Sequence, residues 1–170
     1  KELGKSYHAT IETAKALLND FNEKINLPTD LAANVEDNRV DLLVEELPID
    51  APLFDMGINS IMRLSSAIKN AGTIILNGPA GVFEVEDFAL GTIEMLNACA
   101  ESNGYVVVGG GHTATLIMKR GLADKMGHVS TGGGACLDYL AGKILPGIAS
   151  LQISADKFFM DVTKTVNSNE

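Results

Sequence analysis

Ser130-Thr131-Gly132-Gly133-Gly134-Ala135 joins a short apolar strand pattern at 127–129 to a helical pattern at 135–142. The N–H groups of a first helical turn have no partner within the helix, and the helix dipole favours anions there. Glycine leaves room for a phosphate to approach this backbone directly. The stretch therefore predicts a turn from strand to helix that binds phosphate.

The sequence before this turn repeats the alternation of strand and helix. Continuous apolar runs at 73–76 and 105–108 predict strands that are buried on both faces. Apolar periodicity predicts helices over 59–69, 88–100 and 113–119. This order predicts an α/β fold, in which a doubly wound parallel sheet lies between two layers of helices in a three-layer, Rossmann-like arrangement.

The amino-terminal part of the chain carries a less regular pattern. We expect a helix over 7–23, a short strand over 25–27, a polar loop over 30–38 and a strand over 40–44. The polar tail at 167–170 is expected to fray.

Three of the predicted strands end in glycine clusters, which follow Leu76, Val108 and Val129. Because ligands of parallel sheets bind beyond the carboxyl ends of the strands, we expect the three loops to share one rim. None of the loops matches a Walker motif or the G-x-G-x-x-G pattern of dinucleotide-binding domains. Glycine is also common at structural turns, so the convergence of three loops, rather than any one of them, favours phosphate binding.

The same loops carry side chains that suit a nucleotide. The amide of Asn77 can donate to a phosphate. The carboxylate of Glu84 can accept hydrogen bonds from ribose hydroxyls or, alternatively, can begin a helix. His112 is a candidate phosphate donor or metal ligand, or else a polar surface residue. His8 and His128 are assigned structural or surface roles.

Composition narrows the choice of partner and compartment. The net charge of −9 and the pI of about 4.7 argue against nucleic acid and anionic membranes as partners. Cys99 and Cys136 have no metal-binding spacing, so we interpret them as buried thiols of a reducing cytoplasm. No apolar run reaches about 18 residues, so no membrane span is predicted. The chain begins with Lys1 rather than Met, and we expect a segment to precede it.

The glycine loops as a set resemble those of one enzyme family. Residues 77–84, 109–115 and 128–135, closed by 142–147, are similar in order and spacing to the C-terminal, nucleotide-binding domain of the phosphoglycerate kinases. The resemblance runs from about residue 3 to about residue 151. This family transfers a phosphoryl group between 1,3-bisphosphoglycerate and ADP, with Mg²⁺, in glycolysis and gluconeogenesis.

The resemblance implies an incomplete nucleotide-binding domain over 1–155, followed by a C-terminal tail over 156–170. It implies that the domain binds ATP or ADP, with the phosphates near Asn77, the ribose at Glu84 and the transferred phosphoryl group at backbone N–H groups of glycine. The residues implied for nucleotide binding are Asn77, Gly78, Pro79, Gly81, Val82, Glu84, Gly110, Gly111, His112 and Thr113. Those implied at the transferred phosphoryl group are Gly111, Gly132, Gly133 and Gly134.

One residue departs from the pattern of many family members. They carry an aspartate that binds Mg²⁺ where this chain has His112, a feature that resembles archaeal members. Magnesium prefers oxygen ligands, so no residue of this chain is predicted to bind the metal, and His112 is expected to bond a phosphate instead.

The family's phosphoglycerate-binding N-terminal domain and its catalytic arginine and lysines have no counterpart in this sequence. We therefore expect the isolated chain to bind nucleotide weakly, to lack kinase activity and to self-associate or retain its missing partner piece, whereas the parent would be a monomer or homodimer. The alternatives are an independent nucleotide- or phosphate-binding module and another doubly wound enzyme such as a dehydrogenase. The lack of a dinucleotide fingerprint disfavours the dehydrogenase.

Overall fold

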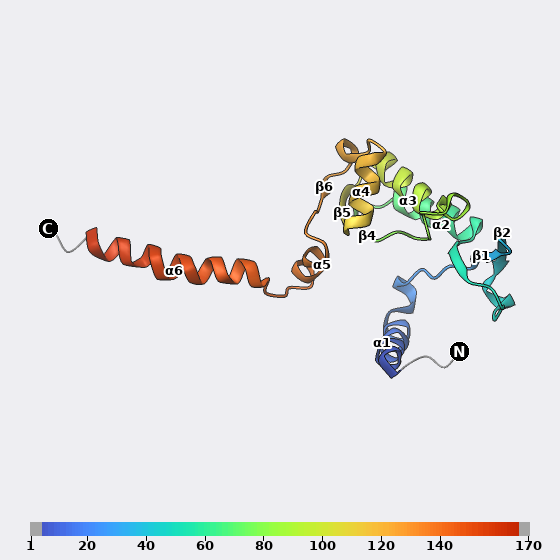
Figure 1. The fold of residues 1–170 in the computed structure, drawn as a ribbon, viewed down its shortest axis with the longest axis horizontal. Coiled ribbons are helices and arrows are strands. Elements are labelled where there is room, and N and C mark those ends of the chain that lie inside the picture. The colour runs from blue at the N-terminus through green and yellow to red at the C-terminus, as the bar shows by residue number, and fades with distance from the viewer. Residues whose placement is uncertain (1–4, 167–170) are drawn as a thin grey trace. The chain divides into compact units, whose positions relative to one another are not determined.

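The computed structural model describes residues 5–166, with side chains described from 7 to 158. The described chain divides into two compact units, and Figure 1 labels their elements. Unit 1 covers the chain through Asn70 together with Ala80–Ala98, and unit 2 covers Ala71–Pro79 and the chain from Cys99 onward.

Unit 1 combines an antiparallel sheet with helices. Its elements are α1 (Lys5–Phe21), the 3₁₀-helix η1 (Asn22–Lys24), β1 (Asp30–Val35), β2 (Asn38–Leu43), η2 (Val44–Glu46), β3 (Leu53–Met56), α2 (Ile58–Lys69), η3 (Glu86–Phe88) and α3 (Leu90–Glu101), whose last residues are assigned to unit 2. The expected helices over 7–23, 59–69 and 88–100 are thus confirmed, with η3 separate from α3.

The strand β1 is the centre of the antiparallel sheet, which has the order β2-β1-β3. Ala32 of β1 pairs with Asp41 of β2 on one side and with Asp55 of β3 on the other. Glu36 and Asp37, at φ 49° and 63°, form the two-residue hairpin turn between β1 and β2. The expected loop over 30–38 is therefore wrong, because pairing on both sides outweighs the weak strand propensity of these residues.

Two further expectations for this region need correction. The predicted strand over 25–27 is absent, since no described strand pairs with it, although Ile25 has an extended backbone. Sequence patterning also missed β3, a strand of four residues that lies between Pro52 and Gly57. The expected strand over 40–44 is confirmed as β2.

The core of unit 1 joins the sheet to α2 and α3. Its buried apolar side chains include Ala32, Ala33, Ile61, Phe88 and Leu96. The rings of Phe54 and Phe88 meet edge to face, with centroids 5.1 Å apart and an interplanar angle of 80°.

Unit 2 contains the predicted parallel sheet. Its elements are β4 (Thr73–Asn77), β5 (Tyr105–Gly109), α4 (Gly111–Lys119), η4 (Ala123–Lys125), β6 (His128–Val129), α5 (Gly134–Leu140) and α6 (Pro146–Val166). The strands pair in parallel in the order β4-β5-β6. The α/β class and its parallel sheet are thereby confirmed, and the antiparallel sheet of unit 1 is an addition to the predicted fold.

Burial differs between the two strands that were expected to be covered on both faces. In the central strand β5, Val106 and Val108 are buried and Val107 is half-buried. In β4, which pairs on one side only, Ile74 is buried but Ile75 is 52% exposed. Full burial is therefore wrong for β4 within the described chain.

The last described element is α6, which the sequence analysis did not predict. It runs without a break across the predicted boundary between 155 and 156, and that division into domain and tail stays a prediction. The tail at 167–170 lies outside the described residues. No helix in the part of the chain that the structure describes has the length and apolarity needed to cross a bilayer.

Candidate functional site

The three glycine loops of unit 2 begin at one edge of its sheet. The parallel register pairs Leu76 of β4 with Val108 of β5, and Val108 with Val129 of β6. Because the strands are parallel and adjacent, their carboxyl ends face the same way. The shared rim expected from the sequence is therefore present for the starts of these loops.

Asn77 lies against the end of β5. A Cβ on Gly109 would come within 2.9 Å of Asn77 Oδ1, so the Asn77 amide lies directly against this glycine. Gly110 adopts φ +91°, and a Cβ on it would lie 3.4 Å from the Gly78 nitrogen. The loops after β4 and β5 thus meet in space, and bare backbone separates them.

The start of α4 presents polar groups that have no partner. Gly110 is the N-cap residue, and its carbonyl accepts the first helical hydrogen bond, from Ala114 N–H at 3.0 Å. The N–H groups of Gly111 and Thr113 have no acceptor among the described residues. Thr113 is 1% exposed, and its Oγ1 is buried without a hydrogen-bond partner. A buried unsatisfied hydroxyl is unfavourable, so these groups fit an oxyanion ligand.

The glycine triplet precedes α5, a helix of only seven residues. Ser130 Oγ accepts from Gly132 N–H at 3.2 Å, and Gly132 O accepts from Ala135 N–H at 3.1 Å. The N–H groups of Gly133 and Gly134 have no acceptor among the described residues. The triplet therefore offers two backbone donors, not three, to a ligand.

The remaining predicted residues belong to unit 1. Val82 N–H donates to Phe54 O of β3 at 2.7 Å, which ties the segment to this strand. Glu84 is exposed and precedes η3 by two residues, so it does not begin a helix. Sequence reasoning missed Thr92, whose buried Oγ1 accepts from Ala80 N–H and Gly81 N–H. A threonine in a first helical turn carries no special signal in sequence.

The described side chains do not form a magnesium site. Among the described residues there is no group of three or more His, Cys, Asp and Glu side chains that could hold a metal ion. His112 is exposed at the start of α4. The donor set of the described chain therefore does not fit a Mg²⁺ ion held by the protein itself.

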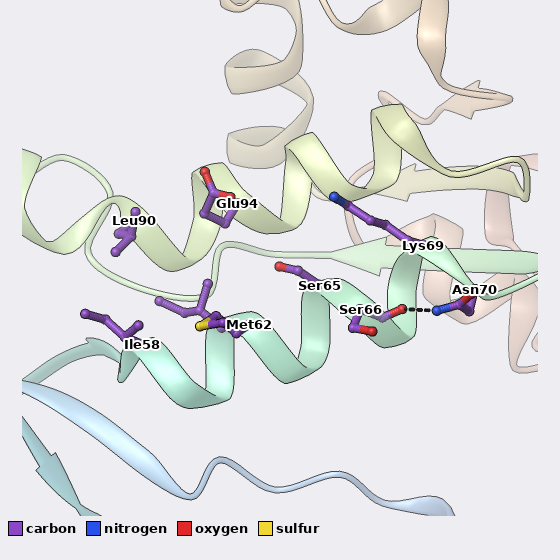
Figure 2. Close-up of a pocket in the computed structure, with 9 residues that line it drawn as sticks. Ile58, Met62, Ser65, Ser66, Lys69, Asn70, Leu90 and Glu94 are labelled. Carbon is purple, nitrogen blue, oxygen red and sulfur yellow. Dashed lines mark hydrogen bonds between the residues drawn. The ribbon is translucent and has the colours of Figure 1, made fainter.

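Each unit has one pocket that we compared with the predicted site residues. In unit 1, a groove of about 620 Å³ runs between α2 and α3, with Ile58, Met62 and Leu90 at its apolar end and Lys69 and Glu94 farther along (Figure 2). No predicted site residue lines this groove.

In unit 2, a pocket of about 470 Å³ is lined by Gly132, Cys136, Tyr139 and Ile148, among others. Its lining is mainly apolar, so it suits packing more than phosphate.

Known proteins resemble the chain over most of its length. The family model described as "Phosphoglycerate kinase" matches residues 1–143. A phosphoglycerate kinase of Methanosarcina mazei is 44% identical over 155 residues, which cover 91% of this chain and 37% of that protein. One from Methanococcus maripaludis is 46% identical over 154 residues, which cover 89% of this chain and 37% of that protein.

Solved structures of phosphoglycerate kinases also resemble the chain. The crystal structure of phosphoglycerate kinase from Pyrococcus horikoshii has a TM-score of 0.79 and 35% identity, with 91% of this chain and 39% of that chain covered. The phosphoglycerate kinase of Coxiella burnetii has a TM-score of 0.73 and 33% identity, with coverage of 82% and 38%. The chain spans about 37% of the length of the relatives it matches. On the strength of this match, which includes both the antiparallel and the parallel sheet segments, the chain belongs to the phosphoglycerate kinase family.

Proposed function

We propose that this chain supplies the nucleotide-binding part of a phosphoglycerate kinase, as a partial domain over 1–155 with a tail over 156–170. The complete protein would transfer a phosphoryl group between 1,3-bisphosphoglycerate and ADP, in the cytoplasm, as a step of glycolysis and gluconeogenesis. The observation that carries the proposal is the unpartnered hydroxyl of Thr113, buried beside bare N–H groups where the glycine loops meet. A nucleotide phosphate would satisfy these groups.

Each loop of unit 2 would contact a different part of the phosphate chain. Asn77 would donate its amide to a nucleotide phosphate, with Gly78 and Pro79 beside it. Gly110, Gly111, His112 and Thr113 would line the phosphate path at the start of α4. Gly132, Gly133 and Gly134 would border the transferred phosphoryl group, to which the N–H groups of Gly133 and Gly134 would donate.

The loop of unit 1 would serve the nucleoside. Glu84 is exposed, and a carboxylate can accept hydrogen bonds through both oxygens, which suits two ribose hydroxyls. Gly81 and Val82 would lie along the base and sugar.

The residues proposed to contact the nucleotide include no lysine or arginine. The resemblance to the family places the catalytic cations in the rest of the parent. When bound with the nucleotide, Mg²⁺ neutralises phosphate charge. The nucleotide oxygens would hold the ion, since the described side chains do not form a site for it. The isolated chain would thus bind ATP or ADP without turnover. Phosphoglycerate would bind to the remainder of the parent, a monomer or homodimer.

Exposed apolar side chains support the expectation that another protein segment covers part of this chain. Ile75 of β4 and Leu151 and Phe158 of α6 are exposed large apolar side chains. We expect the chain alone to self-associate or to retain the rest of the parent. Light scattering that shows a stable monomer would count against this part of the proposal.

The test of the function pairs calorimetry with two alanine variants. Gly111 and Gly134 have no atom within 4 Å of a built Cβ, so Gly111→Ala and Gly134→Ala should leave the fold intact. The unfolding free energy should stay the same or rise by about 0.5 kcal/mol. Affinity for ADP should fall by about tenfold, because the new methyl groups block the approach of phosphate.

The control is Gly72→Ala, an exposed glycine before β4 that also has nothing within 4 Å. It should leave ADP affinity unchanged. Absence of ADP binding by the unmodified protein at millimolar concentration would refute the proposal. Kinase turnover by this chain alone would refute the proposal that the isolated chain is inactive.

A further inference from the structure

The segment 80–85 of unit 1, called here the nucleoside loop, is held by a buried hydroxyl. Thr92 lies in the first turn of α3 and is 2% exposed. Its Oγ1 accepts hydrogen bonds from Ala80 N–H at 3.0 Å and from Gly81 N–H at 3.3 Å. One side chain therefore fixes two consecutive peptide groups at the start of the loop.

A second anchor holds the middle of the nucleoside loop. Val82 N–H donates to Phe54 O at 2.7 Å, and Val85 N–H donates to Val82 O at 3.0 Å. Glu84 lies between Val82 and Val85, and its side chain is exposed. These bonds hold the backbone on both sides of Glu84 and so position the residue that carries the carboxylate.

The base on which the nucleoside loop rests is a buried carboxylate. A Cβ on Gly81 would fall 2.6 Å from Asp55 Oδ1, so the peptide lies directly against this side chain. Asp55, whose side chain is 0% exposed, accepts from Gly91 N–H at 2.9 Å and from Arg39 Nη1 at 3.0 Å. Gly91 precedes Thr92, so the carboxylate also fixes the turn of α3 that presents the hydroxyl.

We propose that Thr92 is a positioning residue for nucleotide binding, through the hydrogen bonds that hold Ala80 and Gly81. The inference rests on the proposed function, because it assigns a purpose to the loop that carries Glu84. Preorganisation of a binding loop lowers the entropy lost when the ligand orders it. Loss of the hydroxyl thus leaves Glu84 chemically intact but less often in place.

The experiment compares Thr92→Val, which keeps the shape and removes the acceptor, with Thr92→Ser, which keeps the acceptor. The first readout needs no ligand: amide hydrogen exchange at Ala80 and Gly81, followed by NMR. Exchange should be about tenfold faster in Thr92→Val, as expected when local opening becomes easier, and near normal in Thr92→Ser. Affinity for ADP should fall about tenfold in Thr92→Val and recover in Thr92→Ser.

The matched control is Ser60→Ala. Ser60 is fully buried in unit 1 and hydrogen-bonds Asp30, with no bond to the nucleoside loop. The Ser60→Ala substitution should destabilise the protein without changing ADP affinity or the exchange of the Ala80 and Gly81 amides. All variants are compared at a temperature where circular dichroism shows them folded.

The outcomes separate the positioning role from the function on which it rests. Normal exchange at both amides in Thr92→Val overturns the role of the hydroxyl, whatever the affinity. Faster exchange with unchanged ADP affinity overturns positioning and leaves the nucleotide site standing. Absence of ADP binding by the unmodified protein overturns the function and, with it, the positioning role.

Discussion

Replacement of Asp30 by asparagine should destabilise unit 1 in a way that depends on pH. Asp30 Oδ1 accepts from Ser60 N–H at 2.7 Å and from Ser60 Oγ at 2.5 Å, and Oδ2 accepts from Asn59 N–H at 2.9 Å. A residue of β1 thus caps the first turn of α2. A Cβ on Gly57 would lie 2.3 Å from Asp30 Cγ, which shows how tightly strand and helix meet.

The magnitude follows from the groups left unpaired. Asn59 is exposed, so water can replace one lost acceptor, whereas Ser60 is buried and its N–H cannot be hydrated. A buried donor without a partner costs about 1–3 kcal/mol, and a lost helix cap about 1 kcal/mol. Asparagine keeps one acceptor oxygen, so Asp30→Asn should lose about 2 kcal/mol at pH 7 and Asp30→Ala about 3 kcal/mol.

The sign of the pH dependence follows from the carboxylate. Burial alone would raise the pKa of Asp30, but hydrogen bonds from Ser60 and Asn59 outweigh it and hold that pKa below its ordinary value. A lowered pKa in the folded state contributes stability above the ordinary value of about 3.9, and this stability is lost as pH falls through the lower folded value. The gap between wild type and Asp30→Asn should therefore be full at pH 7 and narrow below about pH 4.

Urea unfolding followed by far-ultraviolet circular dichroism, repeated from pH 7 downward, measures the gap. Asp50→Asn, at an exposed loop aspartate, supplies the control and should match wild type throughout. Equal stability of Asp30→Asn and wild type at pH 7 would refute the capping argument. A gap of constant size down to the lowest pH at which both proteins fold would refute the role of the charge.

Two further predictions concern buried groups. Leu96 lies in α3 and is 0% exposed, so Leu96→Ala should lower the free energy of unfolding by about 2–5 kcal/mol, measured by the same urea titration. A decrease below about 1 kcal/mol would contradict the place of Leu96 in the core. Burial raises the pKa of the Cys99 thiol to about 11. At pH 8 an aromatic disulfide reagent should therefore label the half-buried Cys136 first and Cys99 only on unfolding. Equal labelling rates of the two cysteines in the folded protein would contradict the burial of Cys99.

The parallel half of the fold is readable in sequence because its strands are local apolar runs. Val106 and Val108 are buried side chains in a strand with partners on both sides, and a glycine loop ends each strand. Composition and order alone therefore predict β4, β5 and β6 and the rim that their loops share. The exposure of Ile75 could not be predicted, because it depends on which segments lie beside β4.

The antiparallel half depends on contacts that local patterning does not encode. Four of the six residues of β1 are Asp, Asn or Ala, which favour strands weakly, and they form a strand because β2 and β3 pair with it. The partners of Arg39 from other elements show the same dependence: Asp55 and the carbonyl of Met56 come from β3, whereas the carbonyl of Asp87 comes from η3. Thr92 could not be identified as a loop anchor either, since its two hydrogen bonds reach 11 and 12 residues back along the chain.

The glycine loops at the ends of the parallel strands first indicated phosphate, and the contacts of individual glycines refine that prediction. Gly81 and Gly91 are required by packing, because a Cβ on either would fall within 2.6 Å of Asp55 Oδ1. Neither needs a ligand to explain it. Gly111 and Gly134 begin α4 and α5, where glycine weakens a helix, and within the described chain a Cβ on either would meet nothing within 4 Å. Because no packing need offsets this weakness, glycine at these two positions fits the proposed access of an anion to the first-turn N–H groups. The case for phosphate therefore rests on these two positions and on the buried hydroxyl of Thr113, rather than on the number of glycines in the chain.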